Sequence, residues 1–207
     1  MKFNVGNYWN ERYKTGRDSG VGSYGAEVER KIELLRDLVN GCYPAAKTIL
    51  DVGCGDFNLG SKLLPYLSKD IEYLGLDLSQ EIVDRNTKEY GTDKIKFKKI
   101  DEVGVFDDRA DVVICMDVLF HIIDQGEYNK MLDTLSKSYD QYLVVSQMGG
   151  IEKVAEWAPH VRPRRLKAWS QGESDILGTL AYRDVIFLPG EVTTKDVMFY
   201  EPTGTDK

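Results

Sequence analysis

Residues 48–60, TILDVGCGDFNLG, constrain the fold more than any other part of the chain. The stretch begins as a short apolar run and ends in small residues, as a buried parallel strand does when it enters a tight turn before a helix. Gly53 and Gly55 allow the backbone to approach a ligand closely, and helix N-terminal amides face polar groups at such a turn. We therefore predict a strand–turn–helix unit with a ligand site at its glycines.

A second carboxylate lies where a ribose would bind. Asp77 follows Gly55 by 22 residues and closes another apolar run, YLGLD. A carboxylate at the tip of the neighbouring strand suits the two hydroxyls of a ribose, which indicates an adenosine-containing cofactor. A dinucleotide fingerprint would place its third glycine at position 58, where this chain has Asn58. That departure disfavours NAD without removing it as an alternative.

The segment Asp51-Val52-Gly53-Cys54-Gly55 resembles the first motif of class I S-adenosylmethionine-dependent methyltransferases, acid-x-Gly-x-Gly. The resemblance implies a Rossmann-like fold and S-adenosyl-L-methionine as the cofactor. Members often have a further glycine where this chain has Phe57, so the shape of the methionine pocket is expected to differ. The cofactor-binding residues expected from the motif and the later strand ends are Asp51, Gly53, Cys54, Gly55, Asp77, Leu78, Asp101, Glu102 and Met116.

The expected role of Asp101 and Glu102 comes from the same resemblance. They follow the third strand, where such enzymes hold the adenine amino group. The alternative is a solvated turn, since an acidic run continues through Asp107 and Asp108.

Strands and amphipathic helices alternate along the chain, which predicts a parallel α/β sheet. Further strands are expected at residues 72–77, 94–100, 111–117 and 142–146. Alternating Lys94, Lys96 and Lys98 place the strand at residues 94–100 at a sheet edge. Residues 185–188 and 197–200 flank Pro189-Gly190 and predict an antiparallel pair. We predict one domain over residues 1–207: a mostly parallel seven-stranded sheet with a C-terminal antiparallel hairpin and helices on both faces.

The N-terminal residues 1–25 are rich in aromatic residues and glycine. They suit either a surface segment anchored by its rings or a lid that closes over a bound cofactor. The sequence YWNERY followed by SGVGSYG is similar to a group of small methyltransferases often encoded near glycan-biosynthesis genes. This resemblance implies that the segment borders the active site, with Tyr8, Trp9 and Tyr13 as candidate acceptor-binding residues.

His121 and His160 are the only histidines. His121 follows the fourth strand by four residues, on the side of the sheet where ligands of open α/β folds bind. Members of the family carry a similar Asp-Val-x-x-His-x segment there. Methyl transfer to a hydroxyl requires removal of a proton, so His121 and Asp117 are the candidate catalytic residues. The alternative is a structural His121 that packs beneath the cofactor and hydrogen-bonds a backbone carbonyl.

Residues 147–182 are expected to form an insertion on the acceptor side. His160 lies there beside Arg162, Arg164 and Arg165. Such a cluster can hold a phosphate or carboxylate on an acceptor such as a nucleotide sugar, with His160 and Arg162 as candidate contacts. A solvated basic loop is the alternative.

Several classes of protein are disfavoured. The net charge of −7 opposes broad nucleic-acid binding, and the Asx-Pro-Pro-aromatic and Pro-Cys motifs of DNA methyltransferases are absent. No apolar run approaches the roughly 20 residues of a membrane span, and the first residues lack the apolar region of a signal peptide. Three cysteines form no CxxC pair, as expected in the cytoplasm. Asp117 and His121 lack a third metal ligand, so no metal is expected.

These features together predict a cytoplasmic methyltransferase that uses S-adenosylmethionine and a small polar acceptor. Because His121 can serve as a base, the leading acceptor is a hydroxyl of a sugar, a nucleotide sugar or a similar metabolite, anionic if the basic cluster binds it. An NAD-dependent oxidoreductase and a cofactor-binding module without transfer activity are the alternatives. The sequence predicts neither the acceptor itself nor the oligomeric state.

Overall fold

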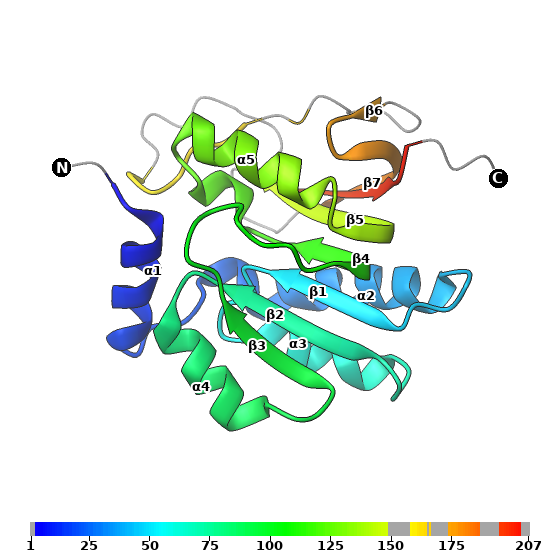
Figure 1. Ribbon diagram of the computed structural model, residues 1–207, viewed down its shortest axis with the longest axis horizontal. Coiled ribbons are helices and arrows are strands. Elements are labelled where there is room, and N and C mark those ends of the chain that lie inside the picture. Colours follow the sequence, from blue (N-terminus) through cyan, green and yellow to red (C-terminus); the bar gives the residue numbers. More distant parts are fainter. Residues whose placement is uncertain (1–2, 149–157, 165, 167–173, 187–194, 204–207) are drawn as a thin grey trace.

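The computed structural model describes residues 3–148, 158–164, 166, 174–186 and 195–203. Helices and strands alternate through the first 148 residues, and the remaining strands are antiparallel (Figure 1). The helices are α1 (Val5–Lys14), α2 (Gly25–Gly41), α3 (Asn58–Leu63), α4 (Gln80–Tyr90) and α5 (Gln125–Leu135), with 3₁₀ turns η1 (Val21–Ser23), η2 (Leu64–Tyr66) and η3 (Leu119–His121). The strands are β1 (Thr48–Val52), β2 (Glu72–Asp77), β3 (Ile95–Lys99), β4 (Ala110–Cys115), β5 (Tyr139–Met148), β6 (Ser174–Asp175), β7 (Gly178–Ile186) and β8 (Lys195–Glu201).

One sheet holds these strands in the order β3-β2-β1-β4-β5-β8-β7-β6. The first five run parallel, whereas β8 is antiparallel to β5 and β7 to β8. The expected seven-stranded sheet is confirmed, with the two-residue β6 added at its edge. The chain leaves β1 toward β2 on one side and returns to β4 on the other, which opens a crevice at their carboxyl ends. Helix α1 stands beyond the arrowheads of β1, β2 and β3 (Figure 1).

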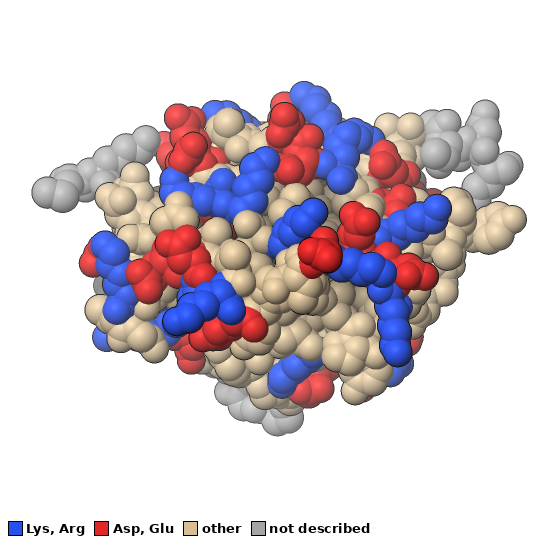
Figure 2. All heavy atoms as spheres, turned by 60° about the horizontal axis from the view of Figure 1, so that its bottom comes forward, with Lys and Arg blue, Asp and Glu red and all other residues tan. Residues whose placement is uncertain are grey.

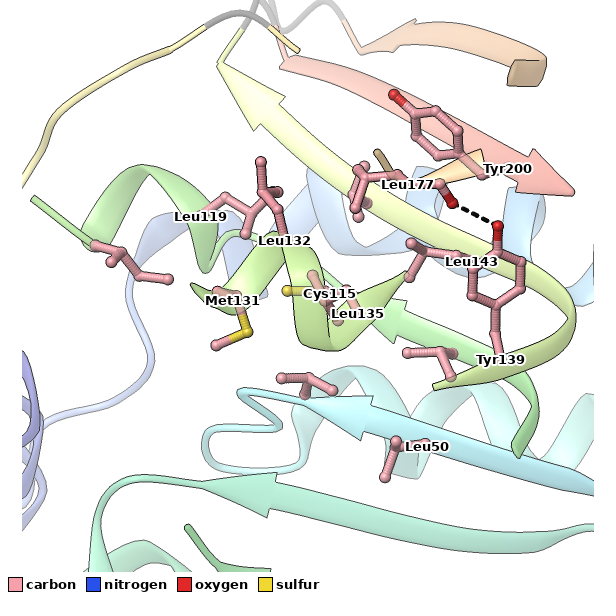
Figure 3. Close-up of a cluster of buried hydrophobic side chains, with 14 of the residues drawn as sticks. Leu50, Cys115, Leu119, Met131, Leu132, Leu135, Tyr139, Leu143, Leu177 and Tyr200 are labelled. Atoms are coloured by element: carbon pink, nitrogen blue, oxygen red, sulfur yellow. Dashed lines mark hydrogen bonds between the residues drawn. The ribbon is translucent and has the colours of Figure 1, made fainter. Parts of the chain in front are cut away.

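The two faces of the sheet carry separate apolar cores. Helix α5 covers one face, where Leu132 and Leu135 join the same cluster as Cys115 of β4 and Leu143 of β5 (Figure 3). Helices α2 and α3 cover the other, which contains Leu35, among others. Because β1, β4 and β5 are covered on both faces, their sequences are apolar almost throughout instead of alternating.

Polar caps fix where α4 and α5 begin. Ser79 accepts a hydrogen bond from the Ile82 amide, and Asp124 Oδ1 accepts from the amides of Gly126 and Glu127 at 2.9 and 3.1 Å. These side chains satisfy backbone donors that have no partner within the helix. Helix α4 therefore begins directly after Ser79, and α5 directly after Asp124.

Removing the α5 cap should cost stability. We expect Asp124→Ala to lower the free energy of unfolding by about 1 kcal/mol, since it leaves helix N-terminal amides without their acceptor. Urea denaturation measures the change. Asp133→Ala is the matched control on the same helix, because it removes only an exposed ion pair with Lys137 and should cost less than about 0.5 kcal/mol. Equal losses in the two variants would contradict the capping role.

The edge strand β3 is not a basic stripe. Lys98 pairs with Asp108 at 2.8 Å, and Lys94, just before the strand, pairs with Asp70 at 3.1 Å. On the face in Figure 2, basic and acidic side chains are interspersed without either sign dominating. The lysines therefore mark a solvated sheet edge, as the alternation indicated.

Some elements differ from the sequence-based expectation. The first residues form helix α1, capped by Asn4, where only an irregular segment or lid was expected. Strands β5, β7 and β8 are longer than expected, because their pairing continues beyond the apolar runs. Pro189-Gly190 and Arg165 lie outside the described residues. No helix in the described part of the chain is long and apolar enough to cross a membrane.

Candidate active site

A cavity lies in the crevice at the carboxyl ends of β1, β2 and β4. It encloses about 710 Å³ of empty space, including its open mouth. Its walls come from the glycine turn, the ends of the three strands, helix α1 and the 3₁₀ turn η3. The expected site residues that line it are Trp9, Tyr13, Gly53, Cys54, Gly55, Asp77, Leu78, Met116, Asp117 and His121.

The two glycines of the first motif are required by backbone shape and by space. Gly53 and Gly55 have φ of +79° and +53°, in the left-handed region that favours glycine. A Cβ on Gly53 would collide with the side chain of Val118, and one on Gly55 with the hydroxyl of Ser19. The turn therefore lets two other segments approach its backbone on the cavity side.

Phe57 keeps the backbone shape of the glycine that it replaces. Its φ is +61°, and its ring is buried against Tyr73, Tyr90 and Phe97, with ring centroids 5.0–5.1 Å apart. Packing of this ring offsets the cost of a left-handed conformation. The side chain is not part of the cavity wall, so it does not fill the space expected for the cofactor.

Asp77 is a buried carboxylate held in place by backbone amides. Its Oδ2 accepts from the Gly55 amide at 3.1 Å, and its Oδ1 accepts from the Ser79 amide at 2.9 Å. Burial raises the pKa of Asp77 to about 6, although the hydrogen bonds from these amides oppose that shift. Each oxygen retains a further lone pair with which it can accept from a ligand hydroxyl.

Asp51 lies behind the glycine turn. It is buried and lines a smaller adjoining pocket with Lys31 and Asp117, and is not part of the main cavity wall. The Tyr73 hydroxyl donates to its Oδ2 at 2.6 Å. Burial raises the pKa of Asp51 to about 7, against the lowering effect of that hydrogen bond.

Asp101 and Glu102 lie outside the cavity. Their side chains are 89% and 72% exposed and pair with Lys99 and Lys130. The apolar residues on either side of them, Ile100 and Val103, line the cavity instead. Their exposure agrees with the solvated-turn alternative, and the expected contact of this pair with the adenine stays a prediction.

Asp117 belongs to a buried cluster of opposite charges. Its Oδ2 accepts from Lys31 at 2.6 Å and from Lys195 at 2.9 Å, and both lysines also pair with Glu27. Although burial opposes the charged form, the two lysines hold the pKa of Asp117 well below its usual range. Such a carboxylate stays ionised and is a poor proton acceptor.

One ring nitrogen of His121 forms a hydrogen bond, and the other has no hydrogen-bond partner among the described residues. Its Nδ1 lies 3.1 Å from the backbone oxygen of His160, which can only accept, so Nδ1 carries the proton and Nε2 holds a lone pair. Burial lowers the pKa of His121 to about 4, despite the opposing bond to that carbonyl. The imidazole is therefore neutral near pH 7.

Rings from distant parts of the chain surround His121. Trp9 meets it edge-on at 5.1 Å between centroids, and His160 stacks on it at 5.4 Å. Tyr8 in turn stacks on His160 at 4.5 Å. Tyr8 and His160 do not line the cavity but support the ring that does. The fold thus brings helix α1 and the segment after β5 together at His121.

The described arginines of the basic cluster hold two loops together. Arg164 donates to the carbonyls of Ile122 and Ile123 at 2.7 and 3.0 Å and lies over the Tyr128 ring at 4.2 Å. Arg162 donates to the Ile123 carbonyl at 2.9 Å. Neither lines the cavity. These contacts explain Arg164 without an anionic acceptor, whereas Arg162 is exposed and retains further donors.

Arg164→Ala separates these two roles. We expect it to lower the free energy of unfolding by about 1–3 kcal/mol, since it removes charge-assisted bonds to two carbonyls. The Km for an acceptor, measured at saturating cofactor, should change less than with Arg162→Ala. Unchanged urea stability together with a raised Km would instead assign Arg164 to anion binding.

Sequence reasoning missed most apolar walls of the cavity. The lining residues that were not expected are Val5, Ser19, Ser23, Val52, Ile100, Val103, Val118, Ile122 and Met131. Ser19 and Ser23 belong to the SGVGSYG motif, so that motif already contained a usable signal. The apolar residues carry no comparable mark. Among the described residues, no group of three potential ligands could hold a metal ion.

Comparison with known proteins indicates which family the part of the chain around this cavity is similar to. Residues 50–141 match the family model of the methyltransferase domain. This part of the chain is therefore similar to a methyltransferase domain. The match spans β1 to the start of β5, and so includes the glycine turn, Asp77 and His121. A search of curated proteins finds no match.

Solved structures with this fold include methyltransferases that act on different atoms. N-methyltransferase NodS from Bradyrhizobium japonicum WM9, in complex with S-adenosyl-L-homocysteine, is 18% identical with a TM-score of 0.72, covering 97% of this chain and 99% of its own. Magnesium protoporphyrin IX methyltransferase from Synechocystis PCC 6803, also with S-adenosylhomocysteine, is 20% identical with a TM-score of 0.66, covering 96% and 98%. An O-methyltransferase family protein from Burkholderia thailandensis is 14% identical with a TM-score of 0.57, covering 86% and 58%.

These matches support the expected fold and enzyme class, but not the expected acceptor. The methyltransferase domain and the relatives crystallised with S-adenosylhomocysteine or S-adenosylmethionine support an S-adenosylmethionine-dependent methyltransferase. The Rossmann-like fold is confirmed. At 14–20% identity, these likenesses reach the fold and not the acceptor.

Proposed function

We propose that this protein transfers the methyl group of S-adenosylmethionine to a small polar acceptor, with a hydroxyl of a sugar or nucleotide sugar as the first candidate. One observation carries the proposal: the buried carboxylate of Asp77 and the neutral imidazole of His121 line the same cavity. The first suits a ribose and the second suits a proton acceptor. The similarity of the N-terminal motif to methyltransferases encoded near glycan-biosynthesis genes supports the sugar acceptor.

The cavity wall fits the parts of this cofactor. Asp77, oriented by two backbone amides, has lone pairs left for the ribose hydroxyls. Ile100 and Val103 offer an apolar surface for the adenine, and the glycine turn leaves room for the methionine part. Bound S-adenosylmethionine supplies an electrophilic methyl group, so the protein's main tasks are positioning and exclusion of water.

His121 is the residue that we assign to proton removal. Its Nε2 lone pair can accept the proton of an acceptor hydroxyl, while the bond from Nδ1 to the His160 carbonyl fixes the ring. Asp117 is less suited, because two lysines stabilise its ionised form. We assign to Asp117 a role in holding the wall of the cavity in place of the catalytic role expected from sequence.

We assign contacts with the acceptor to aromatic residues of α1. Trp9 and Tyr13 line the cavity, and Tyr8 and His160 support the ring of His121. Arg162, exposed at the adjoining loop, can add an anion contact. The three cysteines are free and buried, as in a reducing compartment, and we assign the reaction to the cytoplasm.

Methylation of an amine is the second candidate. The low pKa makes His121 a weak base, and a neutral amine is already nucleophilic and needs less help than a hydroxyl. The N-methyltransferase NodS shares the fold over 97% of this chain, which supports testing amines.

Turnover in a panel of acceptors tests the proposal. The panel pairs sugars and nucleotide sugars with the matching amino sugars, and formation of S-adenosylhomocysteine is measured. We expect turnover with at least one hydroxyl acceptor, and much less with His121→Ala. Turnover with amino sugars alone would favour the second candidate. Binding of S-adenosylmethionine without turnover on any acceptor would favour a module without transfer activity.

A further inference from the structure

Hydrogen bonds fasten residues 16–24 to the glycine turn. Ser19 and Asp56 form a reciprocal pair: the Ser19 amide donates to Asp56 Oδ2 at 3.0 Å, and the Asp56 amide donates to Ser19 Oγ at 2.8 Å. The Tyr24 hydroxyl donates to the same carboxylate oxygen. The side-chain amide of Asn58 donates to the Ser23 carbonyl. Asp56 is thus the residue that receives most of the contacts from this segment.

The fastened segment is part of the cavity wall. Ser19 and Ser23 line the cavity, and Ser19 lies so close to the turn that a Cβ on Gly55 would meet its hydroxyl. Asp56 does not line the main cavity. It therefore reaches the cavity only through the segment that it holds.

A second attachment of the segment is at Gly22, between the residues that Asp56 and Asn58 hold. Lys31 donates to the Gly22 carbonyl at 2.6 Å while it pairs with Glu27 and Asp117. The contacts of Lys31 are buried, whereas Asp56 is partly exposed and also lines a shallow surface hollow. Of the two attachments, the one at Asp56 can be broken without opening the core.

We propose that Asp56 is a positioning residue that docks residues 16–24 over the cofactor cavity, so that the cofactor and its product leave when this contact opens. A carboxylate that accepts from a backbone amide and a phenol holds the segment more strongly than a neutral acceptor would. The proposal rests on the proposed function, because it takes S-adenosylhomocysteine as the product that leaves. It also gives a role to the polar side chains of Asp56 and Asn58, which follow Gly55 closely in the sequence.

Release of S-adenosylhomocysteine, measured by stopped-flow, tests the docking role. The signal is tryptophan fluorescence, to which Trp9 in the cavity wall contributes. We expect Asp56→Asn to raise the dissociation rate roughly tenfold, as loss of charge-assisted bonds would do, and Tyr24→Phe to raise it less. The matched control is Asp70→Asn, which removes an exposed carboxylate paired with Lys94 and should leave the rate unchanged.

Hydrogen exchange of the free protein provides a readout that does not need the ligand. The Ser19 amide should exchange faster in Asp56→Asn, while amides of β4 should keep the wild-type rate. Wild-type release and wild-type exchange at Ser19 in Asp56→Asn would overturn the proposal, as would equal effects from Asp70→Asn. If the wild-type protein does not bind S-adenosylhomocysteine, the proposed function fails, and the exchange at Ser19 still decides whether Asp56 docks the segment.

Discussion

His121→Ala is expected to lower kcat by about 10²–10⁴-fold with little change in the affinity for S-adenosylmethionine. The reason is that His121 lines the cavity and its Nε2 keeps a lone pair, whereas Nδ1 donates to the His160 carbonyl. Kinetics at saturating cofactor measure kcat, and a titration of the variant measures the affinity. A structural His121 predicts the reverse, with weakened cofactor binding and a lower melting temperature but a largely retained kcat.

The pH dependence of the wild-type rate adds a second test of His121. Burial lowers its pKa to about 4, so the active neutral form is gained as the pH rises through about 4, and the rate should be flat near pH 7. A limb near the ordinary value of 6.5 was the simplest expectation from sequence. As the pH falls, the unfolded state takes up this proton at a higher pH than the folded state does. His121 should therefore lower the free energy of unfolding progressively as the pH falls from about 6.5 to about 4. The rate limb near pH 4 and this loss of stability should both be absent in His121→Ala.

Asp77→Asn is expected to weaken S-adenosylmethionine binding by about 1.5–3 kcal/mol, or roughly 10- to 150-fold in Kd. The amide group replaces one carboxylate oxygen with a donor, so it no longer accepts from both ribose hydroxyls. Asp77 accepts from the Gly55 and Ser79 amides with different oxygens, and the one oxygen of asparagine can keep one of these two bonds, whereas alanine keeps neither. The position of Asp77 at a strand end alone suggests that the fold would tolerate alanine. The structure predicts a loss of stability instead, because alanine leaves both buried amides without an acceptor.

The matched control for Asp77 is Asp101→Asn. Asp101 is an acidic residue expected from sequence to hold the cofactor, but its side chain is exposed and outside the cavity. Calorimetric titration of both variants should therefore show a loss for Asp77→Asn and wild-type affinity for Asp101→Asn. The opposite order would contradict the arrangement of the cavity described above.

Features that depend on short stretches of chain were predictable. The glycine turn, the position of Asp77 and the caps of α4 and α5 follow from residues within a few positions of one another. The edge position of β3 was also predictable, because a lysine on every second residue cannot be buried on both faces of a sheet. These local signals were enough to locate the glycine turn and the edge strand along the chain.

Features that depend on tertiary contacts were not predictable. Helix α1 packs on α4 and against the rings near His121. Val5, Trp9 and Tyr13 recur every four residues, but this spacing does not indicate which elements the helix contacts. Near the end of β3 the cavity is lined by Ile100 and Val103, while the two acids between them face solvent. The direction of each side chain in that turn is set by the fold. Likewise, the donors of Arg164 are satisfied by carbonyls about 40 residues away in sequence.

Calorimetric titration of the wild-type protein with S-adenosylmethionine and, separately, with NAD tests the central claim most directly. We predict saturable binding of one S-adenosylmethionine per chain and no heat of binding with NAD, because Asn58 stands where a dinucleotide fingerprint has its third glycine. Binding of NAD without binding of S-adenosylmethionine would contradict it and return the chain to the oxidoreductase alternative.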